Sequence, residues 1–298
     1  MVKSKLQGIF APITTPFDAR GTVLYDHLAS NMQRYATSDL KGFLVFGSNG
    51  ENKSLSQDEK LHILKIIAET KAPQQTLLVA SIYESTKETL EFALLAQESG
   101  ADFITLMPPS YFKSAMKDSV LFQYFSDVAS ELEIPCMLYK APQFSGGLDL
   151  SLELVSKCSK HPNIIGIKDS SSGGIEKLLQ VVPDDFSVLS GSANTFLPAM
   201  LNGAVGGILS IANYLPHLAV ELYNYVTRNE LQKAIVLNKQ IITLNMAISG
   251  IHGVSGVKRA MDLLQFHGDF PRRPLLPIPP EADAKLTSVL REFQSISS

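Results

Sequence analysis

The chain has 298 residues, of which 45% are hydrophobic and 18% are charged, a mix typical of a globular protein with a large core. Its 26 Lys and Arg residues against 29 Asp and Glu residues give a formal net charge of -3. No long run of either sign occurs, so we expect neither a nucleic-acid surface nor one for anionic membranes. The composition favours a partner that is a small molecule.

Cysteine usage and the first residues predict a cytoplasmic protein. Cys136 and Cys158 sit in apolar segments without metal-ligand spacing, which favours free thiols in a reducing compartment. Residues 1–7 carry two lysines but are followed by Pro12 and Pro16, so no secretion signal is expected. No stretch approaches the ~18 to 20 apolar residues of a membrane span. The six histidines are scattered, so we interpret them as surface or packing residues and predict no metal site.

Eight short apolar or β-branched runs recur along the chain, and segments with helical periodicity separate most of them. Strands that are buried on both faces and joined by crossover helices form a parallel sheet. Eight such units predict an α/β fold, the (β/α)8 TIM barrel, with additional C-terminal helices. The predicted strands lie in residues 8–17, 42–48, 77–83, 102–109, 135–142, 164–170, 186–193 and 203–213.

Two helix starts can be read from capping residues. Ser56 with Glu59, and Ser85 with Glu88, each fit the capping box, in which each side chain bonds a backbone N–H of the first turn. Both pairs stand just before segments with helical periodicity. We therefore expect a helix to begin at each pair.

The strand and helix alternation stops near residue 228, and a proline-rich break follows at 270–280. The residues beyond the alternation are expected to be helical. We therefore predict a catalytic barrel domain over residues 1–228 and a C-terminal helical extension over residues 229–298.

In a barrel of this kind the carboxyl ends of the strands build the active site, because the interior is packed solid. Alternation gives Gly166 and Lys168 the same facing, so Lys168 points inward if Ile167 packs against the helices. Burial disfavours the charged ammonium, and a neutral amine can attack a carbonyl carbon to form a Schiff base. A single lysine also fits a solvated surface group, so both interpretations stay open at this point.

A Schiff-base site also needs a proton shuttle and an anchor for the substrate. Tyr139 can move protons if a hydroxyl such as that of Ser48 hydrogen-bonds it. The turn at residues 47–50 can hold a carboxylate, because glycine-containing turns expose backbone N–H groups. Taken singly, the tyrosine also fits a core residue and the turn an ordinary tight turn. Glu51 and Asp169 are expected to accept hydrogen bonds from loop amides.

The joint order of these signals resembles the dihydrodipicolinate synthase and N-acetylneuraminate lyase family, the pyruvate-dependent class I aldolases. The motifs are GSNGE after strand two, a tyrosine after strand four, YxxP after strand five, GIKDSS at strand six and GSA after strand seven. The resemblance runs through nearly the whole chain, including the opening GIFAPITTPF and the helical tail. It implies an enzyme that needs no metal or organic cofactor.

The resemblance also implies roles for single residues. Lys168 matches the Schiff-base lysine and Tyr139 the proton-relay tyrosine. Tyr111 matches the tyrosine that in many members reaches into the site of a neighbouring subunit, although the usual Tyr-Tyr pair reads Ser110-Tyr111 here. Lys140 replaces the asparagine common after the relay tyrosine and is expected to face away from the barrel axis. With Ser48, the lysine and the two matched tyrosines make up the predicted catalytic set.

Departures from the family pattern bear on the substrate. Ser48 and Asn49 fall on the hydroxyl pair that holds the pyruvate carboxylate, where synthases of lysine biosynthesis usually show two threonines. Phe144 stands where those synthases carry an arginine for the second substrate's carboxylate. The Ser-Asn pair and GGLDL at residues 146–150 look more like 4-hydroxy-2-oxoglutarate aldolases and 2-keto-3-deoxy-acid aldolases. The predicted substrate-binding residues are Gly47, Ser48, Asn49, Phe144, Gly191 and Leu209.

The sequence therefore predicts a Schiff-base aldolase that cleaves a 4-hydroxy-2-oxo acid or a 2-keto-3-deoxy acid to pyruvate and an aldehyde. One alternative is a 4-hydroxy-tetrahydrodipicolinate synthase, which joins pyruvate to aspartate semialdehyde, or an N-acetylneuraminate lyase. Another is a non-catalytic protein that binds a 2-oxo acid. The resemblance further implies a homotetramer built as a dimer of dimers.

Overall fold

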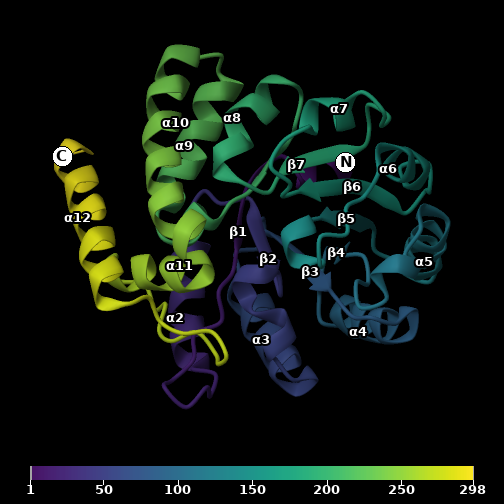
Figure 1. Ribbon diagram of the computed structural model, residues 1–298, viewed down its shortest axis with the longest axis horizontal. Coiled ribbons are helices and arrows are strands. Elements are labelled where there is room, and N and C mark those ends of the chain that lie inside the picture. The colour runs from purple at the N-terminus through teal and green to yellow at the C-terminus, as the bar shows by residue number, and fades with distance from the viewer. Residues whose placement is uncertain (1, 298) are drawn as a thin grey trace.

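Eight parallel strands pair in chain order, and the last pairs with the first, so that the sheet closes into a barrel (Figure 1). The computed structural model describes the backbone of residues 2–297 and the side chains of residues 4–293. Nearly every strand residue is buried, as expected where a sheet packs on side chains inside and on helices outside. The predicted (β/α)8 barrel is confirmed. The strands are β1 (Gly8–Pro12), β2 (Gly42–Val45), β3 (Thr76–Ser81), β4 (Phe103–Leu106), β5 (Cys136–Lys140), β6 (Ile164–Asp169), β7 (Ser187–Ser190) and β8 (Gly206–Ile208).

Helices fill each crossover between consecutive strands and continue after the last one. In Figure 1 the final helix, α12, lies at the outer edge beside α10 and α11. The division of the chain at residue 228 stays a prediction. The helices are α1 (Val2–Lys5), α2 (Tyr25–Ala36), α3 (Gln57–Thr70), α4 (Thr86–Glu98), α5 (Asp118–Ser130), α6 (Leu152–Cys158), α7 (Ile175–Leu179), α8 (Ala193–Leu201), α9 (Pro216–Thr227), α10 (Leu231–Asn245), α11 (Ile251–Leu263) and α12 (Pro280–Ser297).

The two predicted capping boxes have different outcomes. At α3, Ser56 Oγ accepts the N–H of Glu59 at 3.2 Å, and the Glu59 carboxylate accepts the N–H of Ser56 at 2.9 Å, so this box is confirmed. At α4, Ser85 Oγ accepts the N–H of Glu88 at 3.2 Å, but the Glu88 carboxylate accepts a hydrogen bond from the Ser85 hydroxyl at 3.0 Å and not from the Ser85 backbone N–H. At α4 the predicted N-cap contact is confirmed, but the predicted return contact from Glu88 to the backbone N–H of Ser85 is wrong, because the Ser85 hydroxyl is the donor instead.

One helical run differs from the expectation that no segment is long enough to span a membrane. Residues Leu231–Leu263, which include α10, a π-helical turn (Met246–Gly250) and α11, pass that test by length and composition alone. A core helix of a globular protein passes the same test. Here α10 packs against α8 and α9, and α11 packs against the turn after β2. The buried face of α10 includes Ala234, Leu237, Ile241 and Leu244.

A buried ion pair fastens α11 to the turn after β2. Glu51 Oε1 lies 2.6 Å from Lys258 Nζ, and both side chains are 1% exposed. Lys258 Nζ also donates to the carbonyls of Thr15 at 2.6 Å and Phe270 at 2.7 Å. Burial lowers the pKa of Lys258 more than the Glu51 carboxylate raises it. Glu51 accepts the backbone N–H of Arg272 at 2.8 Å, so its predicted role as an acceptor for a loop amide is confirmed.

Replacing Lys258 by methionine leaves the Glu51 carboxylate buried without its charge partner. Breaking such a pair from one side costs about 3–5 kcal/mol, so we expect the free energy of unfolding to fall by that amount. Urea denaturation followed by circular dichroism measures the change. The matched double variant Lys258→Met/Glu51→Gln, which removes both charges, should recover part of the loss. Equal losses in the single and double variants would contradict this account of the pair.

Candidate active site

A cavity of about 730 Å³ opens at the carboxyl ends of the strands. The loops after β2, β5, β6, β7 and β8 supply most of its lining. The π-helical turn and the start of α11 supply a further wall, so the helical tail closes one side of the barrel mouth. This is the end of a TIM barrel at which side chains from different strands can meet around a ligand.

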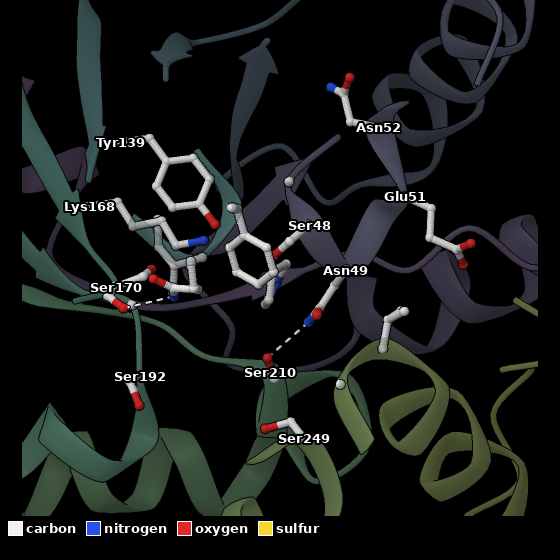
Figure 2. Close-up of a pocket in the computed structure, with 18 of the residues that line it drawn as sticks. Ser48, Asn49, Glu51, Asn52, Tyr139, Lys168, Ser170, Ser192, Ser210 and Ser249 are labelled. Carbon is white, nitrogen blue, oxygen red and sulfur yellow. Dashed lines mark hydrogen bonds between the residues drawn. The ribbon is translucent and has the colours of Figure 1, made fainter. Parts of the chain in front are cut away.

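Lys168 on β6 and Tyr139 on β5 lie side by side in this cavity (Figure 2). They are direct register partners on adjacent parallel strands, and Lys168 Nζ lies 4.1 Å from the centroid of the tyrosine ring. Lys168 is only 3% exposed. Within residues 2–297 its amine has neither a hydrogen bond nor a carboxylate partner. The amine therefore packs against an aromatic ring at the edge of the cavity, and no described carboxylate neutralises it.

The next residue on each of these strands faces the other way. Lys140 and Asp169 are also register partners, and Lys140 Nζ lies 3.8 Å from Asp169 Oδ2 and 3.7 Å from Asp149 Oδ1. Neither Lys140 nor Asp169 lines the cavity, so the predicted outward facing of Lys140 is confirmed. Asp169 Oδ1 accepts the N–H of Ser171 at 2.8 Å, as expected for a loop-amide acceptor. Because side chains alternate in facing along each strand, Lys140 lies on the outer face with its carboxylate partners and Lys168 lies on the inner face without one.

The turn after β2 lies across the cavity from Lys168 (Figure 2). Asn49 Nδ2 donates to Ser210 Oγ at 2.9 Å, which ties this turn to the loop after β8. Ser48 lines the cavity, and in Figure 2 the Tyr139 hydroxyl points toward its side of the space. No hydrogen bond joins Ser48 to Tyr139 in the described part of the chain, so the predicted link between them is not formed in this structure.

Two non-glycine residues with left-handed backbone conformation flank this turn. Phe46 has φ 61° and Glu51 has φ 54°, values that are unusual for residues with large side chains. Such conformations persist only where the surroundings hold them. Lys258 binds the side chain of Glu51, and Asn52 Nδ2 donates to the carbonyl of Phe46 at 2.8 Å. The turn is therefore fixed at both ends by buried polar contacts.

The cavity brings together most of the residues predicted for the site. Gly191 fits its place because a Cβ there would lie 1.9 Å from Ser170 Oγ, closer than two atoms can approach. Phe144 forms part of the wall although its side chain is largely exposed. The predicted residues that line the cavity are Gly47, Ser48, Asn49, Tyr139, Phe144, Lys168 and Gly191.

Two predicted site residues do not line the cavity. Leu209 is fully buried, and its neighbours Ile208 and Ser210 face the cavity instead. The prediction for Leu209 is wrong by one position, a shift that reverses the facing of a residue at a strand end. Tyr111 lies on the loop after β4 and is 80% exposed, with its ring edge-on to Phe112 at 5.0 Å between centroids. Within one chain it does not reach the cavity.

The sequence interpretation missed a group of hydroxyl and amide side chains in the lining. Asn245 Nδ2 donates to Asn194 Oδ1 at 3.0 Å, and Ser249 Oγ donates to Asn245 Oδ1 at 2.8 Å. Ser210 stands at the end of the last predicted strand, so the strand-end rule could have found it. Asn245 and Ser249 carry no local signal, because their position depends on how the tail packs over the barrel.

Charged groups in the lining are few. Glu51 forms its ion pair with Lys258. Lys53 is exposed, and its Nζ lies 3.5 Å from Glu84 Oε1. Outside the cavity, the fold brings His27 and His267 into a stack with centroids 4.1 Å apart, beside Asp269. Among the described residues, these are the one group of three or more His, Cys, Asp or Glu side chains that lie close enough to share a metal ion. The two histidines are far apart in the sequence, and we had interpreted them as surface or packing residues.

Comparison with known proteins places this site in a family. The family model described as the dihydrodipicolinate synthetase family matches residues 5–293. The chain is 32% identical over 294 residues to the 4-hydroxy-tetrahydrodipicolinate synthase of Methanosphaerula palustris, covering 96% of this chain and 99% of the relative. It is 31% identical over 298 residues to the probable mitochondrial 4-hydroxy-2-oxoglutarate aldolase of Emericella nidulans, covering 96% and 94%.

A solved structure agrees with these sequence matches. YagE, a prophage protein from E. coli K12 of the dihydrodipicolinic acid synthase family, was solved in complex with pyruvate. It is similar to this chain with a TM-score of 0.89 and 25% identity, covering 97% of this chain and 98% of YagE. Because the family model spans nearly the full length, the chain belongs to the dihydrodipicolinate synthetase family.

Proposed function

We propose that this protein is a class I aldolase that cleaves a 4-hydroxy-2-oxo acid or a 2-keto-3-deoxy acid to pyruvate and an aldehyde. The observation that carries the proposal is the amine of Lys168, which is buried, faces the cavity and lacks a carboxylate partner within residues 2–297. Relatives named as an aldolase and as a synthase support an enzyme of this class, and the pyruvate bound to YagE supports a 2-oxo acid as ligand.

The substrate carboxylate is proposed to lie on the turn after β2. Ser48 and Asn49 open a short 3₁₀ helix, where the first backbone N–H groups have no acceptor within the helix. Such N–H groups can bind an anion. The turn lies across the cavity from Lys168, so a 2-oxo acid bound there presents its C2 carbonyl toward the amine.

Formation of the Schiff base needs one nucleophile and one proton carrier. The unprotonated amine of Lys168 attacks C2, and the carbonyl oxygen becomes the hydroxyl of a carbinolamine. Tyr139, whose ring lies against the amine, is proposed to donate a proton to that hydroxyl as it leaves as water. The product is a protonated imine between C2 and the lysine nitrogen.

Cleavage then uses the imine as an electron acceptor. Tyr139 takes the proton of the C4 hydroxyl, the C4–O bond becomes a carbonyl, and the electron pair of the C3–C4 bond moves toward the imine. The aldehyde leaves and an enamine remains on Lys168. Protonation at C3 and hydrolysis of the imine release pyruvate and restore the free amine. The protein contributes the nucleophile, the proton carrier and the fixed geometry between them.

The rest of the cavity bears on the second product. Phe144 lies in its lining, and no arginine lines it among residues 2–297. An aromatic ring cannot pair with the carboxylate of aspartate semialdehyde, which disfavours the condensation. The synthase alternative is supported by relatives that carry that name. A non-catalytic 2-oxo-acid-binding protein would not need both Lys168 and Tyr139 in contact.

Assembly and compartment are part of the same proposal. We propose a homotetramer in which Tyr111 contacts a neighbouring subunit, because an aromatic side chain 80% exposed beside Phe112 favours an interface. A cytoplasmic location is supported by Cys136 and Cys158, which are unpaired and buried. Burial raises the pKa of both thiols to about 12, so neither is activated for exchange.

Sodium borohydride with pyruvate should fix an adduct on Lys168, because it reduces the imine to a stable secondary amine. Peptide mass spectrometry should locate the added mass on Lys168 and not on Lys140, which lies on the adjacent strand in ion pairs. Lys168→Met should abolish the adduct and lower kcat by at least about a thousandfold. Folded, active protein that takes no label would exclude the Schiff base.

Tyr139→Phe removes the proposed proton carrier and keeps the ring that lies against Lys168. We expect kcat to fall by about 10²–10⁴-fold with little change in KM. Tyr124→Phe is the matched control, because Tyr124 is a buried tyrosine outside the cavity, bonded to Thr89 at 3.0 Å. Its kcat should stay close to that of the parent. Equal kcat values in Tyr139→Phe and the parent would remove Tyr139 from the mechanism.

A substrate panel tests the direction of the reaction. The value of kcat/KM for pyruvate release from a 2-keto-3-deoxy sugar acid with a single carboxylate should exceed that for condensation with aspartate semialdehyde by at least about tenfold. 4-Hydroxy-2-oxoglutarate belongs in the same panel, because its second carboxylate would also meet the uncharged ring of Phe144. The physical reason is that Phe144 offers no charge to the semialdehyde's carboxylate. A coupled assay for pyruvate and an assay for the condensation product measure the two rates. Faster condensation would favour the synthase alternative.

A further inference from the structure

A second buried amine lies directly behind the turn that borders the cavity. Lys60 on α3 is 3% exposed and does not line the cavity. Its Nζ donates to Asn52 Oδ1 and to the Tyr83 hydroxyl, each at 3.1 Å, and lies 4.5 Å from the centroid of the Tyr83 ring. Among the side chains of residues 4–293, no carboxylate pairs with it. Its described compensation consists of two neutral dipoles and two aromatic faces, the second being Phe92 with its ring centroid 5.2 Å from Nζ.

The contact with Lys60 holds the oxygen end of Asn52. An ammonium has donors and no acceptor, so Asn52 must turn its carbonyl oxygen toward Lys60. The NH₂ group of Asn52 then points the other way and donates to the carbonyls of Phe46 at 2.8 Å and Ala80 at 3.4 Å. The two backbone carbonyls and the ammonium all require this orientation, and they hold the amide from opposite ends. Without Lys60 the oxygen end of Asn52 would lose its donor, and the side chain would be held from one end only.

The carbonyl held by Asn52 belongs to the strained residue at the start of the turn. Phe46 has φ 61°, and the following residues Gly47, Ser48 and Asn49 line the cavity. Release of that carbonyl would let Phe46 relax toward an ordinary backbone conformation. The peptide planes that follow would rotate with it, and with them the N–H groups proposed to bind the substrate.

We propose that Lys60 is a positioning residue, which acts through Asn52 to hold the Phe46–Asn49 segment in the conformation that binds the substrate carboxylate. The inference rests on the proposed function, because the position of this segment matters only if a carboxylate binds there. Lys60 does not touch the substrate. Its effect should fall on binding, since the turn contacts the carboxylate in the same way before and during the reaction.

The charge of Lys60 provides a way to separate this role from a merely structural one. Burial, followed by repulsion from Lys53, lowers the pKa of Lys60 from 10.5 to about 8. The folded state thus disfavours the charged form. The cost of Lys60 to the free energy of unfolding therefore falls as the pH rises from about 8 toward 10.5. At pH 7 its removal relieves that cost, which offsets the two lost hydrogen bonds. If the hydrogen bonds of Lys60 stabilised the fold by more than its burial costs, replacing it would instead lower Tm.

The test is Lys60→Met, compared with the parent and with Lys65→Met, an exposed lysine on the same helix. The pyruvate concentration that gives half-maximal borohydride trapping on Lys168 should rise about tenfold in Lys60→Met. KM for the cleaved acid should rise in parallel, kcat should change by less than about threefold, and Tm at pH 7 should not fall. Lys65→Met should match the parent in all four measurements.

Asn52→Ala removes the intermediary and leaves Lys60 in place. It should raise the half-saturating pyruvate concentration as Lys60→Met does, and the double variant should add little, because both changes break the same chain of contacts. Independent, additive effects would overturn the inference. Asn52→Ala also decides the question if Lys60→Met does not fold, because an unchanged pyruvate dependence in Asn52→Ala would overturn the positioning role.

The outcomes distinguish this inference from the proposed function. If the parent itself traps no pyruvate on Lys168, the proposed function fails. If the parent traps pyruvate and Lys60→Met has the same half-saturating concentration, the function stands and the inference is overturned. A variant that loses Tm and kcat together, with KM unchanged, would show that Lys60 is a scaffold residue.

Discussion

The pairing of β5 with β6 is the constraint on which the chemistry of this protein depends. Parallel strands in direct register set Tyr139 beside Lys168, and the same register sets Lys140 beside Asp169 on the opposite face. Each lysine has a neighbour of a different kind: one has an aromatic ring and one has carboxylates. Because closure of the barrel fixes this register on both sides, the unpaired amine cannot turn toward the carboxylates behind it. The fold thereby keeps the proposed nucleophile free of ion pairs at the barrel mouth.

Rules that act over a few residues predict much of this arrangement. The wrong and missed site residues have causes that these rules do not cover. The facing of Lys168 and Lys140 follows from a period of two along a strand that continues past both. Leu209 was placed one residue out of phase with this alternation, because Ile208 and Ser210 on either side of it line the cavity, and a strand as short as β8 gives the sequence little with which to fix the phase. Asn245 reaches the cavity only because α10 packs on α8, a contact between distant segments that no local pattern encodes.

Three buried lysines surround the turn after β2, and each compensates its burial in a different way. Lys258 has a carboxylate and two carbonyls, Lys60 has an amide oxygen, a hydroxyl and two aromatic rings, and Lys168 has an aromatic ring alone. The amount of polar compensation falls from the first to the last. A fully paired amine is suited to holding structure, whereas an uncompensated one can react. The same residue type thus forms a structural ion pair at Lys258, and its partners suit it to the proposed positioning role at Lys60 and to the proposed nucleophile at Lys168.

The helical tail acts on the site in two ways that are physically linked. Lys258 on α11 holds Glu51, one of the two left-handed residues of the turn, while Asn245 and Ser249 just before α11 line the cavity opposite. A displacement of α11 would therefore move the turn proposed to bind the carboxylate and the opposite wall of the cavity together. Substrate range and binding strength are coupled through one helix. Changes of specificity that keep the barrel strands intact should accordingly be sought in the segment from Asn245 to Lys258 as well as in the strand-end loops.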